Sequence, residues 1–168
     1  MTMTTALPQG DVRLLDTEVA RELLGGTELA RVAYVAPDGT PRVLPVMFHW
    51  TGDELVFCTF AGAAKIKHLR ARPDVAVTID TAGMPPKVLL LRGPVTVDDV
   101  DGAAPEYLAA HRRYGGPEHA ETVRAELDGP GLVMARIGLR PTWVGVLDFV
   151  TRFPGGGTAD DFARRGRR

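Results

Sequence analysis

The chain has 168 residues, of which 45% are hydrophobic and 24% are charged, and its formal net charge is −1. This length suits one domain that buries enough apolar area to be stable without disulfides. The near-neutral charge argues against non-specific nucleic-acid binding, which needs a basic surface, and no apolar run approaches the roughly 20 residues of a membrane-spanning helix.

Turn residues and hydrophobic periodicity place the elements in chain order. Asp16 can cap a first short helix, the Pro-Asp-Gly turn at 37–39 joins two strands of a hairpin, and Pro73 ends a second helix. Two further helices begin with Pro105 and Pro117, a residue favoured in the first helical turn. The expected helices are residues 16–24, 63–71, 105–114 and 117–127, and the expected strands are 29–36, 40–50, 55–59, 75–79, 87–97, 132–139 and 143–149.

Many short strands with only brief helices predict a mainly β fold. The hairpin spacings leave no room for crossover helices, so we expect an antiparallel barrel of six or seven strands spanning residues 1–150. Residues 88–91 (VLLL) are apolar on both faces of their strand, more than one small barrel can bury. We therefore expect a homodimer in which a second copy covers one face. Residues 151–168, with their glycine run and clustered arginines, are expected to form a flexible tail.

Cysteine and histidine usage argues against disulfides and metal sites. Cys58 is the only cysteine, which is typical of a reducing compartment, and we expect a cytoplasmic protein. His49, His68, His111 and His119 lie on different expected elements and show no metal-ligand spacing with Cys58, so we expect no metal.

Two of the three lysines, Lys65 and Lys67, lie in one Gly/Ala-rich loop between an expected strand and an expected helix. Such a loop presents unpaired N–H groups and the positive end of the helix dipole, which suit phosphate. The alternative is a solvated lysine pair on a helix surface. The loop is therefore a candidate anion site.

Several segments occur in an order known from one family. These are 42–48 (RVLPVMF), 57–59 (FCT), 62–65 (GAAK), 72–73 (RP) and 92–93 (RG). This order resembles the pyridoxamine 5′-phosphate oxidase-like, FMN-binding split barrels, and the resemblance covers roughly residues 16–150. The resemblance implies a dimeric split β-barrel that binds FMN in a cleft between the subunits. It also implies an oxidoreductase that transfers hydride to a small-molecule substrate.

The resemblance also implies roles for individual residues. Val46 and Met47 are expected at the edge of the flavin ring, Thr59 near the ribityl chain or phosphate, and Lys65 on the phosphate. The full set of candidate cofactor-binding residues is Arg42, Pro45, Val46, Met47, Cys58, Thr59, Lys65, Lys67, Lys87 and Val88. Tyr107 and His111 are candidate substrate contacts, with a solvated helix face as the alternative. No catalytic side chain is named, because hydride moves through the cofactor's own ring.

The chain departs from the vitamin B6 oxidases at their phosphate-binding positions. Ala63 and Ala64 stand where those oxidases carry Ser and Arg, and His111 and Gly115 stand where they carry an Arg and a Ser. We therefore expect pyridoxine phosphate to be a poor substrate. The closer likeness is to the branch that includes reductases using FMN or the deazaflavin coenzyme (F-420). A flavin or haem carrier that does not turn over is the remaining alternative.

Overall fold

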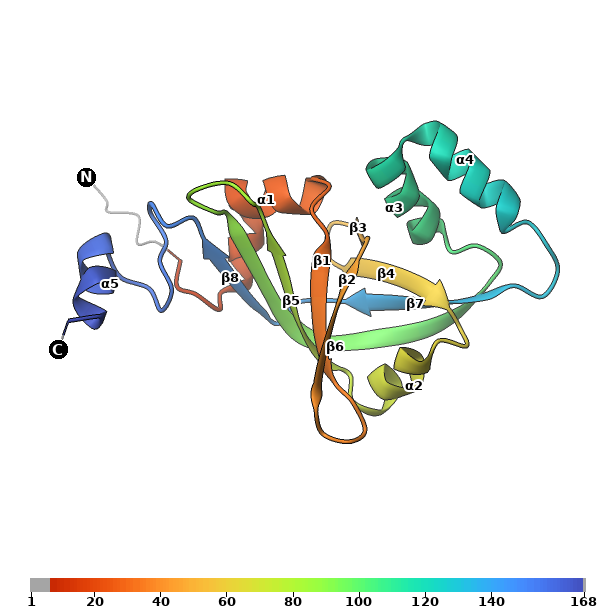
Figure 1. The fold of residues 1–168 in the computed structure, drawn as a ribbon, viewed down its shortest axis with the longest axis horizontal. Helices are drawn as coiled ribbons and strands as arrows, with labels where there is room; N and C mark the ends of the chain where they lie inside the picture. The colour runs from red at the N-terminus through yellow and green to blue at the C-terminus, as the bar shows by residue number, and fades with distance from the viewer. Residues whose placement is uncertain (1–6, 168) are drawn as a thin grey trace.

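The computed structural model describes residues 7–167 and contains one antiparallel sheet system with short helices around it (Figure 1). The strands are β1 (Ala30–Val35), β2 (Pro41–Val46), β3 (His49–Trp50), β4 (Leu55–Phe60), β5 (Asp74–Asp80), β6 (Val88–Asp101), β7 (Val133–Leu139) and β8 (Trp143–Leu147). The helices are the 3₁₀ turn η1 (Val12–Asp16) and α1 (Glu18–Gly25), α2 (Ala64–Ala71), α3 (Pro105–Gly115), α4 (Pro117–Glu126) and α5 (Ala159–Arg165).

The long strand β6 joins the two halves of the barrel. The strands follow the order β2-β1-β5-β6-β7-β4-β3, and β8 adds to β6 beside this path. The first part of β6 pairs with β5 and β8, whereas residues 95–101 pair with β7. Gly93 lies in β6 just before the strand begins to pair with β7. A Cβ at this position would lie 3.1 Å from the carbonyl oxygen of Arg140. Gly93 thus allows the loop between β7 and β8 to approach β6 closely.

The predicted mainly β, antiparallel split barrel is confirmed, but residues 7–167 hold eight strands rather than six or seven. The extra strand arises because the expected strand at 40–50 is two strands, β2 and β3. Phe48 lies between them with its side chain fully buried, and its carbonyl oxygen accepts a hydrogen bond from Arg113 of α3 instead of a neighbouring strand. A backbone group engaged by a distant side chain cannot continue the strand ladder.

The N-cap of the first helix lies one residue later than expected. Thr17, not Asp16, is the N-cap of α1, and its Oγ1 accepts from the Ala20 N–H at 3.4 Å. Asp16 belongs to the preceding turn η1, and its exposed carboxylate lies 3.5 Å from Arg21. The inward face of α1 contributes Leu23 and Leu24 to the hydrophobic core.

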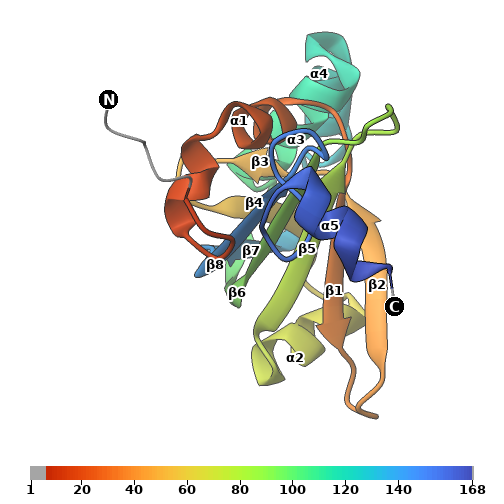
Figure 2. The ribbon, with the colours of Figure 1, turned by 90° about the vertical axis from the view of Figure 1, so that its left-hand side faces the viewer.

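The remaining helices lie at the ends of the barrel (Figures 1 and 2). The hairpin of α3 and α4 lies beside β3 and β4, and α2 lies near the end of β4. Beyond β8, residues 151–167 include α5, which carries a capping box between Thr158 and Asp161. The ring of Phe162 on α5 stacks near that of Phe153, with 5.7 Å between centroids. The flexibility expected for this tail stays a prediction. Within residues 7–167, no helix is long and apolar enough to cross a bilayer.

Candidate functional site

Lys65 and Thr59 form the centre of the expected anion site. The Nζ of Lys65 lies 3.4 Å from the Oγ1 of Thr59, which joins the end of β4 to the first turn of α2. The N-cap of α2 is Ala63, which has no side chain to cap the helix, so its first N–H groups lack a side-chain acceptor. Lys65 is half-buried, and no ion pair among residues 7–167 includes it. A half-buried ammonium beside a hydroxyl and free N–H groups fits a phosphate.

A small pocket between β4 and α3 brings together four of the predicted residues. Val46, Met47, Cys58 and Tyr107 line a cavity of about 130 Å³ between the end of β2, strand β4 and helix α3. Burial, followed by the charge of Glu106, raises the pKa of Cys58 to about 12, so the thiol is protonated at neutral pH. A protonated thiol is a poor nucleophile, and Cys58 therefore acts as part of the pocket wall.

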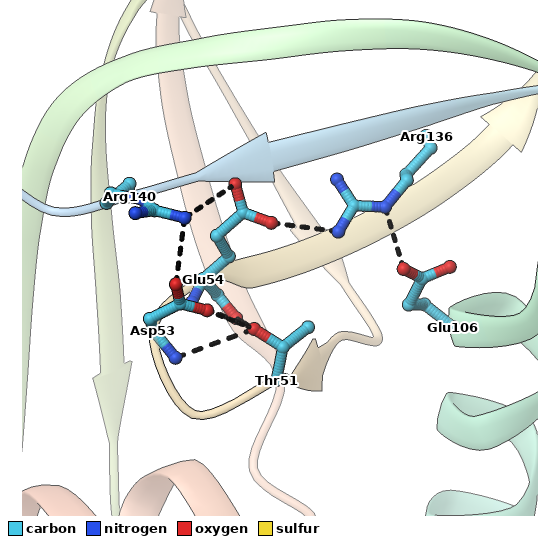
Figure 3. A network of polar contacts seen from close by, with 6 residues as sticks. All are labelled: Thr51, Asp53, Glu54, Glu106, Arg136 and Arg140. Atoms are coloured by element: carbon cyan, nitrogen blue, oxygen red, sulfur yellow. Dashed lines mark hydrogen bonds and ion pairs between the residues drawn. The ribbon is translucent and has the colours of Figure 1, made fainter.

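Arg136 of β7 holds two carboxylates beside this pocket (Figure 3). Its Nε donates to Glu106 at 2.7 Å and its Nη2 donates to Glu54 at 2.9 Å. Arg140 adds a second, more exposed contact to Glu54 at 3.8 Å and also lies 2.8 Å from Asp53. Burial opposes charge on Glu106, but the hydrogen bond and charge of Arg136 outweigh it, and the pKa of Glu106 lies below its usual value. Arg136 thus ties α3 to the β4–β7 pair.

Four predicted cofactor residues lie apart from the pair of Thr59 and Lys65. Arg42 pairs with Asp38 in the hairpin turn, at 3.2 Å. Lys87 pairs with Glu22 of α1. The other two are Lys67, which lines a separate hollow of about 300 Å³ with His68 and Pro37, and Val88, which lies opposite Leu147 of β8. A fifth predicted residue, Pro45, is exposed on β2 and lies opposite Arg31 of β1. The cofactor roles of all five residues stay predictions.

The second predicted substrate residue, His111, is engaged within the helical hairpin. Its Nδ1 lies 2.9 Å from the Nε2 of His119, and its ring centroid is 4.4 Å from that of Tyr107. Gly115 makes room for this pair, because a Cβ there would lie 2.3 Å from the His119 ring. His111 therefore supports the packing of α3 against α4 and has little surface left for a ligand.

The histidine pair makes stability depend on pH. Burial, and then the charge of His119, lowers the pKa of His111, so the folded protein holds this ring neutral more strongly than the unfolded chain does. The unfolded chain binds more protons below about pH 6.5, and stability is expected to fall as the pH drops from about 7 to about 5. His119→Gln keeps a hydrogen-bonding partner without a second charge, and should make this decline shallower. Urea unfolding at several pH values measures it, and equal slopes for both proteins would contradict the assignment.

The outer face of the sheet formed by β2, β1, β5, β6 and β8 carries the apolar run noted in the sequence. In β6, Leu89 and Leu91 point into the core and are fully buried, whereas Leu90 lies on the opposite face and is only half-buried. Its cross-strand neighbours are Thr78 and Gly145, and the ring of Trp143 lies over Gly145, so that Leu90 is covered in part. Toward β2 the face continues to Val43, whose exposed fraction is 68%. One copy of the chain thus leaves apolar surface on this face uncovered.

Sequence reasoning did not identify Glu106 and Arg136 as neighbours of the site. The two residues are separated by 30 positions, and their contact depends on how α3 lies against β7. The single signal in the sequence was an arginine within the otherwise apolar strand 132–139, which indicates a buried partner.

This chain is similar to a known protein family and to several solved structures. A family model described as "Pyridoxamine 5′-phosphate oxidase" matches residues 16–137. No curated protein matches the chain in sequence.

Several solved structures have a similar fold. One titled "F420 Reductase" is 29% identical, with a TM-score of 0.58, and the match covers 74% of this chain and 94% of that one. A haem-binding protein from Mycobacterium smegmatis is 18% identical, with a TM-score of 0.56 and coverage of 87% and 59%. A pyridoxamine 5′-phosphate oxidase-related, FMN-binding protein from Nostoc punctiforme is 15% identical, with a TM-score of 0.52 and coverage of 82% and 81%. The last two similarities concern the fold alone.

Proposed function

This chain belongs to the pyridoxamine 5′-phosphate oxidase family, and on that basis we propose that it is an oxidoreductase that binds a flavin-type cofactor between two subunits. The observation that carries the proposal is the half-buried Lys65, whose Nζ lies 3.4 Å from Thr59 beside the uncapped first turn of α2. In this role Lys65 and Thr59 bind the cofactor's phosphate, and the N–H groups of α2 replace the serine and arginine that the loop lacks.

A second copy of the chain supplies the rest of the cofactor site in this proposal. The pocket lined by Val46, Met47 and Cys58 has a volume of about 130 Å³, whereas small-molecule sites commonly measure about 300–1,000 Å³. One subunit alone therefore offers contacts to one edge of a flavin ring. The half-buried Leu90 face provides apolar surface on which the second copy packs.

The deazaflavin coenzyme is a specific alternative to FMN. The structure titled "F420 Reductase" is 29% identical to this chain over most of its own length, a higher identity than that of the FMN-binding structure from Nostoc punctiforme. The alanines at positions 63 and 64 also remove phosphate donors expected of a vitamin B6 oxidase. Either coenzyme uses the same Lys65 site in this proposal.

The residues of the chain bind and orient the cofactor rather than react with it. When bound, a flavin or deazaflavin supplies hydride transfer through its own ring system. The pocket walls from β4 and α3 limit the access of water, and Arg136 fixes α3 through Glu106. Since His111 is engaged by His119 and position 115 is glycine, a substrate phosphate has few donors on this helix. Pyridoxine phosphate is therefore expected to be a poor substrate.

Absorption spectroscopy of the purified protein tests the proposal. We expect saturable binding of FMN or of coenzyme F420, and reduction of the bound cofactor by NADPH or by reduced F420 should be followed by reoxidation when a quinone is added. A bound cofactor that never cycles would favour a carrier, and a haem spectrum would favour haem storage. Failure to bind any of the three would overturn the proposed function.

A further inference from the structure

A second cavity, larger than the Cys58 pocket, is lined by residues of β3 and α3. It has a volume of about 640 Å³ and opens between η1 and α1, strand β3 and helix α3. Leu15, Leu24, Trp50 and Ala109 give it a largely apolar wall with one aromatic ring. This size and composition are typical of small-molecule binding sites.

Arg113, on the wall of this cavity, has no carboxylate partner in the part of the chain that the structure describes. Arg113 is half-buried, and its guanidinium donates to neutral oxygens, among them the carbonyl of Leu24 at 3.0 Å and the carbonyl of Phe48. It also lies over the rings of Phe48 and Tyr114, at 4.4 and 4.9 Å from their centroids. None of the ion pairs formed within residues 7–167 includes Arg113. Because buried charges are normally paired, this arrangement favours an anion nearby.

Three arginines and one carboxylate, that of Asp16, line the cavity, and the pKa of a further lining residue reflects the charge of Arg113. His49 of β3 lines the same cavity, and burial followed by the charge of Arg113 lowers its pKa, although Glu106 on the opposite side acts against this shift. Protonation of His49 is therefore disfavoured beside Arg113. A neutral imidazole can still exchange hydrogen bonds with a polar ligand.

Two more arginines, Arg21 and Arg112, line the cavity, and each forms only a long, exposed ion pair. Arg21 lies 3.5 Å from Asp16, and Arg112 lies 3.5 Å from Glu121, and both arginine side chains are largely exposed. Exposed pairs at this separation contribute little stability. Both guanidinium groups can therefore turn toward a ligand at small cost.

We propose that this cavity binds an amphipathic organic anion, a carboxylate on a flat apolar body, at a site separate from the Lys65 loop. The apolar body packs against Trp50 and Leu24, and the carboxylate lies toward Arg112 and Arg21 in the field of Arg113. Binding compensates the charge of Arg113, which has no ion-pair partner among residues 7–167. The site does not depend on a flavin or on a second copy of the chain.

Binding of 2-naphthoate, with uncharged 2-naphthamide as the matched ligand, tests this inference. Calorimetry should show naphthoate binding at least about tenfold more tightly than naphthamide, since a charge-assisted hydrogen bond is worth about 1.5–3 kcal/mol. The indole N–H resonance of Trp50 should shift on titration, while that of Trp143, on β8, should not. Equal affinities for the two ligands, or a shift confined to Trp143, would overturn the proposal.

Substitutions separate this site from the cofactor site. Arg112→Gln should weaken naphthoate binding several-fold and leave naphthamide unaffected, whereas Arg70→Gln, a similarly exposed arginine paired with Asp99 on the far side of the barrel, should change neither. Ala109→Trp fills the cavity and should abolish binding of both ligands. Lys65→Ala should leave naphthoate binding unchanged. Naphthoate binding that persists in Ala109→Trp, or that is lost in Lys65→Ala, would place the ligand elsewhere.

Discussion

Lys65→Ala is expected to weaken binding of the flavin-type cofactor about ten- to a hundredfold. The loss corresponds to one charge-assisted hydrogen bond, about 1.5–3 kcal/mol, in a site where the Lys65 ammonium is half-buried beside Thr59. Titration of apo protein with FMN and with coenzyme F420, for wild type and variant, measures the effect. The fold should be unaffected, because no ion pair within the described residues includes Lys65.

Lys67 provides the matched control for this prediction. It lies on the same helix, but two positions along a helix turn its side chain by about 200°, and it is exposed beside a different hollow. Lys67→Ala should therefore change cofactor affinity much less than Lys65→Ala does. Equal and negligible effects of the two substitutions would show that both lysines are simply solvated, and would remove the phosphate site from the proposal.

Leu90→Asp is expected to convert the proposed homodimer into monomers. Leu90 is half-buried in a single copy, on a strand between β5 and β8, in a sheet face that a partner would cover completely. An unpaired carboxylate buried in such an interface costs several kcal/mol, enough to shift a dimer toward monomers at micromolar concentration. Sedimentation velocity of wild type and variant measures the change.

Thr96→Asp is the control for the dimer prediction. Thr96 is also on β6, but it is exposed and pairs with Gly138 of β7, beyond the point where the strand changes sheets. This variant should remain a dimer. A wild-type protein that sediments as a monomer would contradict the dimer, and with it the two-subunit cofactor site, while leaving the anion cavity at Arg113 untouched.

Local sequence patterns were enough to predict most of the fold. The Pro-Asp-Gly turn at 37–39 gave the β1–β2 hairpin, and the proline at the start of each of α3 and α4 gave their positions, because turn and cap preferences act over a few residues. The strand at 40–50 was wrong as one element. Its break depends on Arg113, a residue more than sixty positions away that takes the carbonyl of Phe48.

The candidate site also combines features that could be predicted from the sequence with contacts that could not. The proximity of Lys65 to Thr59 was predictable, because the two residues flank one short loop, and so was an apolar strand at 88–91. The contacts of Arg136 with Glu54 and Glu106 were not, since they join segments far apart in the chain.

The sequence alone therefore determined the mainly β, antiparallel barrel, the loop that joins Thr59 to Lys65 and the apolar strand at 88–91, whereas the phosphate site and the partner inferred from them stay predictions. Only the tertiary structure decided that His111 pairs with His119, and that Arg113, which lines a large cavity, has no carboxylate partner among residues 7–167. The reason is physical: turns, caps and strand faces follow from neighbouring residues. The pairing of a charged or titratable side chain depends on which distant segments pack around it.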